Sequence, residues 1–238
     1  MIMAKTNVWM SVSDLMTGLM VIFLFVSIAY MVRAQKLIQQ RKQELTEFVD
    51  TKNKLYDELH ETFKQQIGND VLAINNDLSM RFAKAESLFD KGQLFVSARF
   101  ANTLEEVIPI YMNVLLHDSL RTHIKEIRIE GHTDTKPFGP SDSDPYLSNL
   151  DLSQKRAREV VKCVRGICAK NFEARDQKLI EEWLTAVGYS YTHALDADGN
   201  YVSESGRPID MDRSKRVEIR VITDDYRVLE GIVKQWQK

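Results

Sequence analysis

The hydrophobic pattern divides the chain into an apolar N-terminal run, a polar helical stretch and a mixed segment that occupies the rest of the sequence. Residues 15–32 read LMTGLMVIFLFVSIAYMV and contain no charged side chain. About 20 apolar residues are enough to cross the hydrocarbon core of a membrane. This run predicts a transmembrane helix over residues 11–32, after a short N-terminus of residues 1–10.

A cleaved signal peptide is the alternative for this run. Ser27-Ile28-Ala29 loosely fits the small-x-small pattern of a cleavage site. The preceding segment carries only Lys5 as a basic side chain, and Asp14 stands where signal peptides favour positive charge. We therefore favour a retained anchor.

The charges that flank the run give a conflicting indication of orientation. Arg33, Lys36, Arg41 and Lys42 follow it, whereas Lys5 is the one basic side chain before it. Taken alone, the positive-inside rule would place the C-terminal bulk in the cytoplasm. The orientation therefore has to come from the rest of the chain.

Residues 33–67 are predicted to form a helical linker. Apolar side chains recur three or four residues apart, which places a stripe along one helix face, and Gly68 ends the pattern. Arg41 and Lys52 interrupt the stripe where a tight coiled coil has Leu or Ile. A plain tether, a weakly self-paired helix and a helix that binds a partner or plugs a channel all remain open.

Residues 68–225 have the composition of a globular α/β domain, followed by a tail of residues 226–238. The alternation of apolar and charged positions predicts strands over 124–130 and 217–222 and, less regularly, over 71–82 and 183–191. Helices are predicted over 98–116, kinked or divided at Pro109, and over 153–168. We expect an α+β sandwich, with a small sheet covered on one face.

A surface excursion that contains a turn at residues 198–200 and runs to residue 212 is predicted. It begins with the sequence DADGN, which resembles half of a calcium loop but lacks the glutamate at its fixed spacing. An ordinary turn at residues 198–200 is the preferred interpretation.

The composition and the cysteine positions argue against several classes of function. A net charge of −2 with 28% charged residues does not indicate a nucleic-acid binder. Cys163 and Cys168 lie five positions apart on one predicted helix, too far for a disulfide, so they stay reduced or buried unless the helix ends before Cys168. We expect no catalytic residues, metal site or cofactor, and hence no enzyme.

Asp14 is the first candidate functional residue. An acid at the edge of a membrane span either lies harmlessly at the interface or has a function. Met16, Thr17, Gly18 and Met20 give this end of the helix a surface suited to packing against other helices. There the charged form of the acid would be disfavoured, so it could exchange a proton or a sodium ion. One helix cannot form the pathway alone, which predicts a polytopic membrane partner.

The DLMTGLM stretch that starts at Asp14 resembles the membrane segment of MotB-type flagellar stator subunits. That resemblance implies that Asp14 binds the translocated ion, for which we favour the proton over sodium.

Three further motifs, IRIEGHTD from Ile127, SNLDLSQKRAREVV from Ser148 and RSKRVEIRV from Arg213, together resemble the OmpA-like peptidoglycan-binding domain. The resemblance implies a ligand that contains diaminopimelate. Asp134 would receive its ammonium and Arg156 would pair with a carboxylate, while N–H groups near Ser153 at the predicted helix start add an anion site. Asn149 and Leu152 would shape the pocket.

The chain departs from that family pattern in two places. The loop over residues 135–147 is longer than in the leanest members. The closing motif, NRRVE in the family, reads SKRVE here. Arg216 keeps the family position and is predicted to bind peptidoglycan, but the other changes put a binding role of this strand in doubt.

The short N-terminus and the sequence SDLMTGLMVIFLF most resemble the ZorB-type subunits of Zorya antiphage defence systems. That resemblance implies an ion-driven rotary stator, with a MotA-like or ZorA-like membrane partner, a self-dimer and contact with peptidoglycan. It implies a single-pass inner-membrane protein with a cytoplasmic N-terminus and a periplasmic domain. A flagellar MotB-type stator subunit and a wall-anchoring OmpA-like membrane protein are the alternatives.

Overall fold

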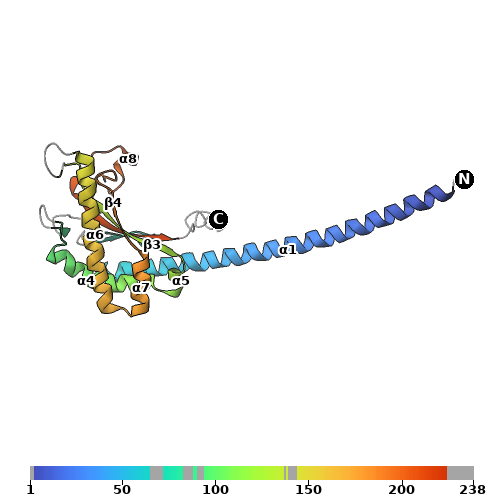
Figure 1. Ribbon diagram of the computed structural model, residues 1–238, viewed down its shortest axis with the longest axis horizontal. Coiled ribbons are helices and arrows are strands. Elements are labelled where there is room, and N and C mark those ends of the chain that lie inside the picture. The colour runs from blue at the N-terminus through green and yellow to red at the C-terminus, as the bar shows by residue number, and fades with distance from the viewer. Residues whose placement is uncertain are drawn as a thin grey trace. The chain divides into compact units, whose positions relative to one another are not determined.

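The computed structural model describes residues 3–64, 72–82, 88–89, 94–136, 138 and 144–223 (Figure 1). The helices are α1 (Met3–Thr62), α4 (Ala98–Leu115), α5 (Asp118–Arg121), α6 (Pro145–Asn171), α7 (Ala174–Trp183), α8 (Val202–Ser205) and α9 (Met211–Ser214). The strands are β1 (Leu72–Ile74), β2 (Met80–Phe82), β3 (Ile124–His132), β4 (Leu184–Gly188) and β5 (Arg216–Thr223). The chain divides into two compact units, and the boundary falls within α1 between Glu47 and Phe48.

In the described residues, the first unit is the part of α1 that ends at Glu47, and it contains the apolar run. From Trp9 onward this helix is long and apolar enough to cross a membrane, and its large side chains are exposed. At about 1.5 Å per residue the predicted span 11–32 measures roughly 33 Å, close to the ~30 Å of a hydrocarbon core. The helix therefore meets the length requirement of a single span.

The second unit begins at Phe48, inside the segment predicted to be a linker. Phe48, Leu59 and Phe63 are buried and belong to the hydrophobic core of the domain. These residues are part of the apolar stripe predicted along the linker helix. Their burial in the core of the domain explains why this face of the helix is apolar.

The sheet has the strand order β1-β2-β5-β3-β4. Only the β3–β4 pair is parallel; the other neighbours are antiparallel. The single strand predicted over 71–82 is wrong, because β1 and β2 form a hairpin there. Leu78 takes a positive φ of 64° in the turn, and Tyr111 Oη donates a hydrogen bond to its carbonyl oxygen at 2.8 Å.

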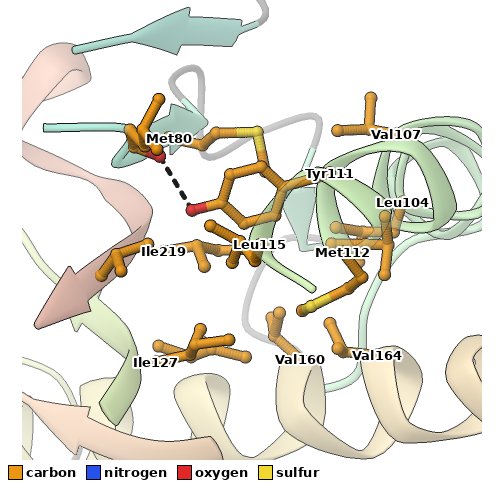
Figure 2. Close-up of a cluster of buried hydrophobic side chains, with 14 of the residues drawn as sticks. Met80, Leu104, Val107, Tyr111, Met112, Leu115, Ile127, Val160, Val164 and Ile219 are labelled. Atoms are coloured by element: carbon orange, nitrogen blue, oxygen red, sulfur yellow. Dashed lines mark hydrogen bonds between the residues drawn. The ribbon is translucent and has the colours of Figure 1, made fainter. Parts of the chain in front are cut away.

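Helices α4 and α6 pack on one face of the sheet through apolar side chains (Figure 2). In β3 and β5 every second residue faces this core, including Ile127 and Ile219, which explains the alternation in the sequence. Of the two outcomes expected at Pro109, a kink or a division, the division is wrong: α4 runs unbroken from Ala98 to Leu115. Its buried face on both sides of the proline holds it together.

Helix α6 begins two turns earlier than predicted. Pro145 occupies its first turn, and the Asp144 side chain caps it by accepting hydrogen bonds from the N–H groups of Tyr146 and Leu147 at 2.8 and 3.2 Å. The prediction of free N–H groups near Ser153 is therefore wrong, because Ser153 lies inside the helix. Asn149 and Leu152 also lie on the helix.

Both cysteine thiols are free, and α6 continues through them. Burial raises the pKa of Cys168 to about 11 and also raises the pKa of Cys163. Both side chains therefore stay protonated and unreactive at neutral pH.

The predicted excursion contains the expected turn, with Gly199 at a φ of 84°, and also the short helices α8 and α9. It folds over the second face of the sheet. Arg216 donates a hydrogen bond to the His193 carbonyl oxygen at 3.0 Å, and Arg220 donates to the Tyr201 hydroxyl at 3.3 Å. The sheet is thus covered on both faces here, and the expectation of one covered face needs this correction.

Candidate functional site

The candidate site lies where the end of β3 meets α6. Gly131 makes this junction possible, since a Cβ at this position would lie far inside van der Waals contact with the carbonyl oxygen of Ser153. Asp134 lies two residues beyond the end of the strand and is buried. Its Oδ1 accepts a hydrogen bond from the N–H of Lys136 at 3.0 Å, so the carboxylate is held in one orientation.

Asn149 ties the chain after Asp134 to the first turn of α6. Its side-chain amide donates hydrogen bonds to the carbonyl oxygens of Lys136 and Pro145, both at 3.0 Å. Leu152, one turn further along the helix, is buried. Asn149 thus holds the chain next to Asp134, and the role of Asn149 and Leu152 in shaping a ligand pocket stays a prediction.

Arg156 lies one turn beyond Leu152. Its guanidinium carbon is 4.7 Å from the centre of the Phe89 ring, a cation–π arrangement. Burial lowers the pKa of Arg156, and the negative charge of Asp134 opposes that change. The structure therefore brings Asp134 and Arg156, which stand far apart in the sequence, within electrostatic reach of each other.

Ser190 joins three parts of this site and was not predicted. It takes a positive φ of 53° and is completely buried. Its N–H donates to Ser153 Oγ at 3.0 Å, its hydroxyl donates to the Tyr146 carbonyl oxygen at 3.0 Å, and its own carbonyl oxygen accepts from the Thr133 N–H at 2.9 Å. It thereby fixes the β3 end against α6, next to Asp134.

Lys215 is a second residue near the site that was not predicted. Its ammonium lies 3.8 Å from Asp134 Oδ2 and 2.9 Å from Asp212 Oδ1. Its position corresponds to the first arginine of the family motif NRRVE. The sequence shows this replacement of arginine by lysine, but the sequence alone does not indicate what the lysine contacts.

Arg216 occupies a different environment from the other predicted residues. Its Nε donates to Glu218 at 2.6 Å, and Nη1 donates to the carbonyl oxygens of His193 and Ser214 at 3.0 and 3.1 Å. The side chain is fully buried. Arg216 is thus engaged by partners inside the domain, and direct contact with a ligand remains a prediction.

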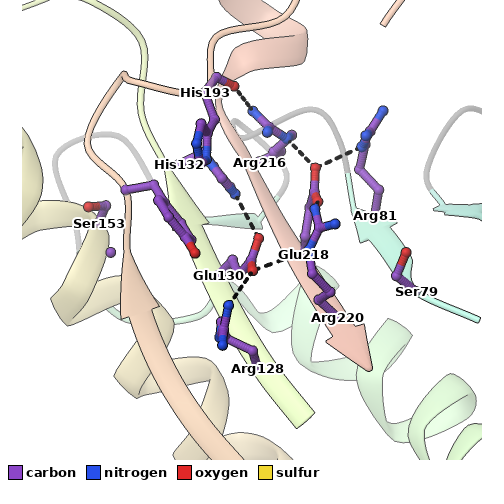
Figure 3. Close-up of polar contacts among 12 residues, drawn as sticks. Ser79, Arg81, Arg128, Glu130, His132, Ser153, His193, Arg216, Glu218 and Arg220 are labelled. Carbon is purple, nitrogen blue, oxygen red and sulfur yellow. Dashed lines mark hydrogen bonds and ion pairs between the residues drawn. The ribbon is translucent and has the colours of Figure 1, made fainter. Parts of the chain in front are cut away.

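Arg216 belongs to a charge cluster on the sheet face opposite the helices (Figure 3). Glu218 pairs with Arg81 at 2.9 Å and with Arg220 at 2.7 Å, and Arg220 also lies 3.2 Å from Glu130. Burial alone would raise the pKa of Glu218, but the attraction of Arg216 and Arg81 outweighs it and lowers this pKa to about 2. The carboxylate is therefore ionised at any physiological pH.

The same cluster offers a set of potential metal ligands. Atoms of Glu130, His132 and Glu218 lie within 4.8 Å of one another. Burial lowers the pKa of His132 to about 4, so its ring is neutral. However, guanidinium groups already compensate both carboxylates, and a divalent cation would have to displace them. The arrangement is that of a structural ion-pair network.

Asp14 lies on the membrane-compatible part of α1. Thr17 and Gly18 follow Asp14 by three and four positions, so the three residues lie on the same face of the helix. The Thr17 hydroxyl donates to the Ser13 carbonyl oxygen at 2.8 Å, which satisfies it within the helix. The residues beside the acid therefore have small side chains, and the Thr17 hydroxyl already has a hydrogen-bond partner. Such a surface suits close packing against another helix.

No family model matches the chain. The curated protein ZorB of Escherichia coli strain ATCC 8739 is 34% identical over 231 residues, which cover 95% of this chain and 92% of that protein. ZorB of Escherichia coli O139:H28 is 29% identical over 222 residues, which cover 92% and 81%.

Solved structures also resemble the chain. A MotB-like protein from Desulfovibrio vulgaris has a TM-score of 0.49 and 20% identity, covering 76% of this chain and 96% of that one. The periplasmic domain of Helicobacter pylori MotB has a TM-score of 0.42 and 17% identity, covering 66% and 84%. These superpositions are too loose to bear on function.

Proposed function

Because this chain belongs to the ZorB family, we propose that it is the peptidoglycan-anchored, ion-carrying subunit of an ion-driven rotary stator complex in Zorya antiphage defence. The observation that carries the proposal is that the fold brings Asp134 and Arg156 within electrostatic reach of each other at the β3–α6 junction. One acidic and one basic group, both partly withdrawn from water, suit a ligand that carries both charges.

Wall binding follows from the chemistry of these two groups. The ligand would be the diaminopimelate of a peptide stem, which has an ammonium and two carboxylates. Asp134 receives the ammonium, and the guanidinium of Arg156 forms a bidentate pair with a carboxylate. Asn149 and Leu152 shape the walls of the pocket, and Arg216 supports it from the charge cluster below.

Ion transfer is assigned to Asp14. A lone ionised carboxylate within hydrocarbon is costly, so the acid has to be enclosed by the helices of a polytopic partner of the MotA or ZorA kind. Taking up a proton removes the charge and lets the acid pass through an apolar environment. We favour the proton over sodium because a single carboxylate suffices for it.

The proposed function implies a membrane topology, which the flanking charges leave unsettled. A domain that binds peptidoglycan is useful in the periplasm, so we propose a single-pass inner-membrane protein with a cytoplasmic N-terminus. Two copies side by side would present two acids to one partner assembly. Family membership favours this defence role over a flagellar stator or a plain wall anchor.

Sedimentation with peptidoglycan tests the anchoring. The full-length chain in detergent should pellet with purified sacculi, and Arg156→Ala should bind about 10- to 100-fold more weakly, since a hydrogen bond to a charged group contributes ~1.5–3 kcal/mol. The control is Arg165→Ala, which removes an exposed arginine of α6 paired with Glu181. Wild-type protein that stays in the supernatant would refute the anchoring.

A further inference from the structure

The proposed wall site has a second basic side chain besides Arg156, the lysine Lys215. Lys215 lies between two acids, and its side chain is 21% exposed. One acid is Asp134 inside the site, at 3.8 Å; the other is Asp212, 80% exposed, at 2.9 Å. The lysine thus has a partner within the site and an alternative partner in solvent.

The two oxygens of Asp134 have different neighbours. Oδ1 already accepts the hydrogen bond of the Lys136 N–H, whereas Oδ2 faces the Lys215 ammonium. An incoming ammonium would therefore use Oδ2. The ammonium of lysine and that of the ligand carry the same charge and need the same acceptor, so they repel each other at this oxygen.

We propose that Lys215 competes with the ammonium of the ligand for Asp134 and so sets the affinity of the site, while Asp212 draws the lysine away. This inference rests on the proposed wall-binding function. When an ammonium-bearing ligand binds, the Lys215 side chain shifts fully to Asp212, which it already contacts. Asp212 thereby assists binding without touching the ligand, and Lys215 opposes it.

The two residues predict effects of opposite sign. Lys215→Met retains the length of the side chain and removes the competing charge. Because the ammonium lies 3.8 Å from Asp134 Oδ2, the pair is a weak one, and binding should become roughly two- to fivefold tighter. Asp212→Asn removes the acid that draws the lysine away from Asp134, so binding should become weaker by a similar factor. In the double variant, loss of Asp212 should have no further effect, because the lysine on which it acts is gone.

The measurement uses the full-length chain in detergent. Calorimetric titration with meso-diaminopimelate gives the affinity, and pelleting with sacculi repeats the comparison on the polymer. Lys162→Met and Asp198→Asn are matched controls, because each removes one exposed, ion-paired charge elsewhere on the domain. Lys215→Gln provides a second neutral variant, and far-UV circular dichroism verifies that each variant is folded.

The outcomes are distinct. Weaker binding of Lys215→Met and Lys215→Gln would show that the lysine contacts the ligand, and would overturn the inference while leaving wall binding intact. Unchanged binding in both variants, or an effect of Asp212→Asn that persists in the double variant, would overturn it as well. A wild-type chain that binds neither probe would refute the proposed wall-binding function itself.

Discussion

Replacement of Glu218 by glutamine tests the importance of the charge cluster for the fold. This carboxylate accepts hydrogen bonds from Arg216, Arg220 and Arg81, at 2.6, 2.7 and 2.9 Å. Glutamine keeps the shape of the side chain and loses the charge. Arg216, whose side chain is fully buried, would then lack its counter-ion.

The magnitude follows from the shifted pKa. A fall from the ordinary value of 4.5 to about 2 corresponds to a contribution of about 3 kcal/mol at ~1.4 kcal/mol per pH unit. Removal of one partner of a buried ion pair typically costs ~3–5 kcal/mol. We therefore expect Glu218→Gln to lower the free energy of unfolding of the domain by about 3 kcal/mol at pH 7.

The sign of the pH dependence follows from the same shift. Because the folded pKa lies below the unfolded one, the contribution is fully present above pH 4.5 and is lost as the pH falls toward 2. The glutamine variant lacks this group, so its stability should fall less steeply over that range. The difference between the two proteins should shrink as the medium becomes more acidic.

Urea unfolding followed by circular dichroism measures this on a fragment that begins at residue 44 and so retains Phe48. Glu181→Gln is the control, because its pair with Arg165 is half exposed and should be worth at most ~1 kcal/mol. A second variant, Glu218→Gln with Arg216→Met, removes the unpaired charge and should recover part of the loss. If Glu218→Gln matches the control, or keeps the wild-type slope between pH 2 and 4.5, the reasoning is refuted.

Three further substitutions have defined outcomes. Asp14→Asn should abolish protection in a phage plating assay while the protein still inserts in the membrane; normal protection would end the ion-carrier hypothesis. Gly131→Ala should destabilise the domain by more than ~2 kcal/mol in urea unfolding, because its Cβ meets the Ser153 backbone; a change below 0.5 kcal/mol would contradict the close packing. Ser190→Ala removes the hydrogen bond to the Tyr146 carbonyl oxygen and should cost about 1 kcal/mol and weaken sacculus binding; Ser148→Ala, which removes an exposed helix hydroxyl, should do neither.

Local pattern was sufficient for the elements that depend on near neighbours. The uncharged run of residues 15–32 predicts a membrane-length helix without reference to the rest of the chain. Strands β3 and β5 were predicted because one face of each packs on a core. The start of α6 was missed, because Pro145 follows a stretch that has the composition of a loop, and because Asp144 acts as a cap only once the helix exists.

The candidate site divides in the same way. The motifs that resemble the OmpA-like domain single out Asp134, Asn149, Leu152 and Arg156, since each motif lies on one short piece of chain. The binding role of these residues stays a prediction. Ser190 could not be predicted, because its importance comes from three partners on three separate segments.

The charged face of the sheet shows most clearly what the sequence determined and what it left to the tertiary structure. The alternation of apolar and charged residues along the strands assigns Glu130, Arg216 and Glu218 to the face away from the helices. From the sequence this face is predicted to be exposed to solvent. In the structure these side chains are buried, because the excursion between β4 and β5 closes over them. The period of a strand determines which face a side chain takes, and only the path of a distant segment decides whether that face meets water.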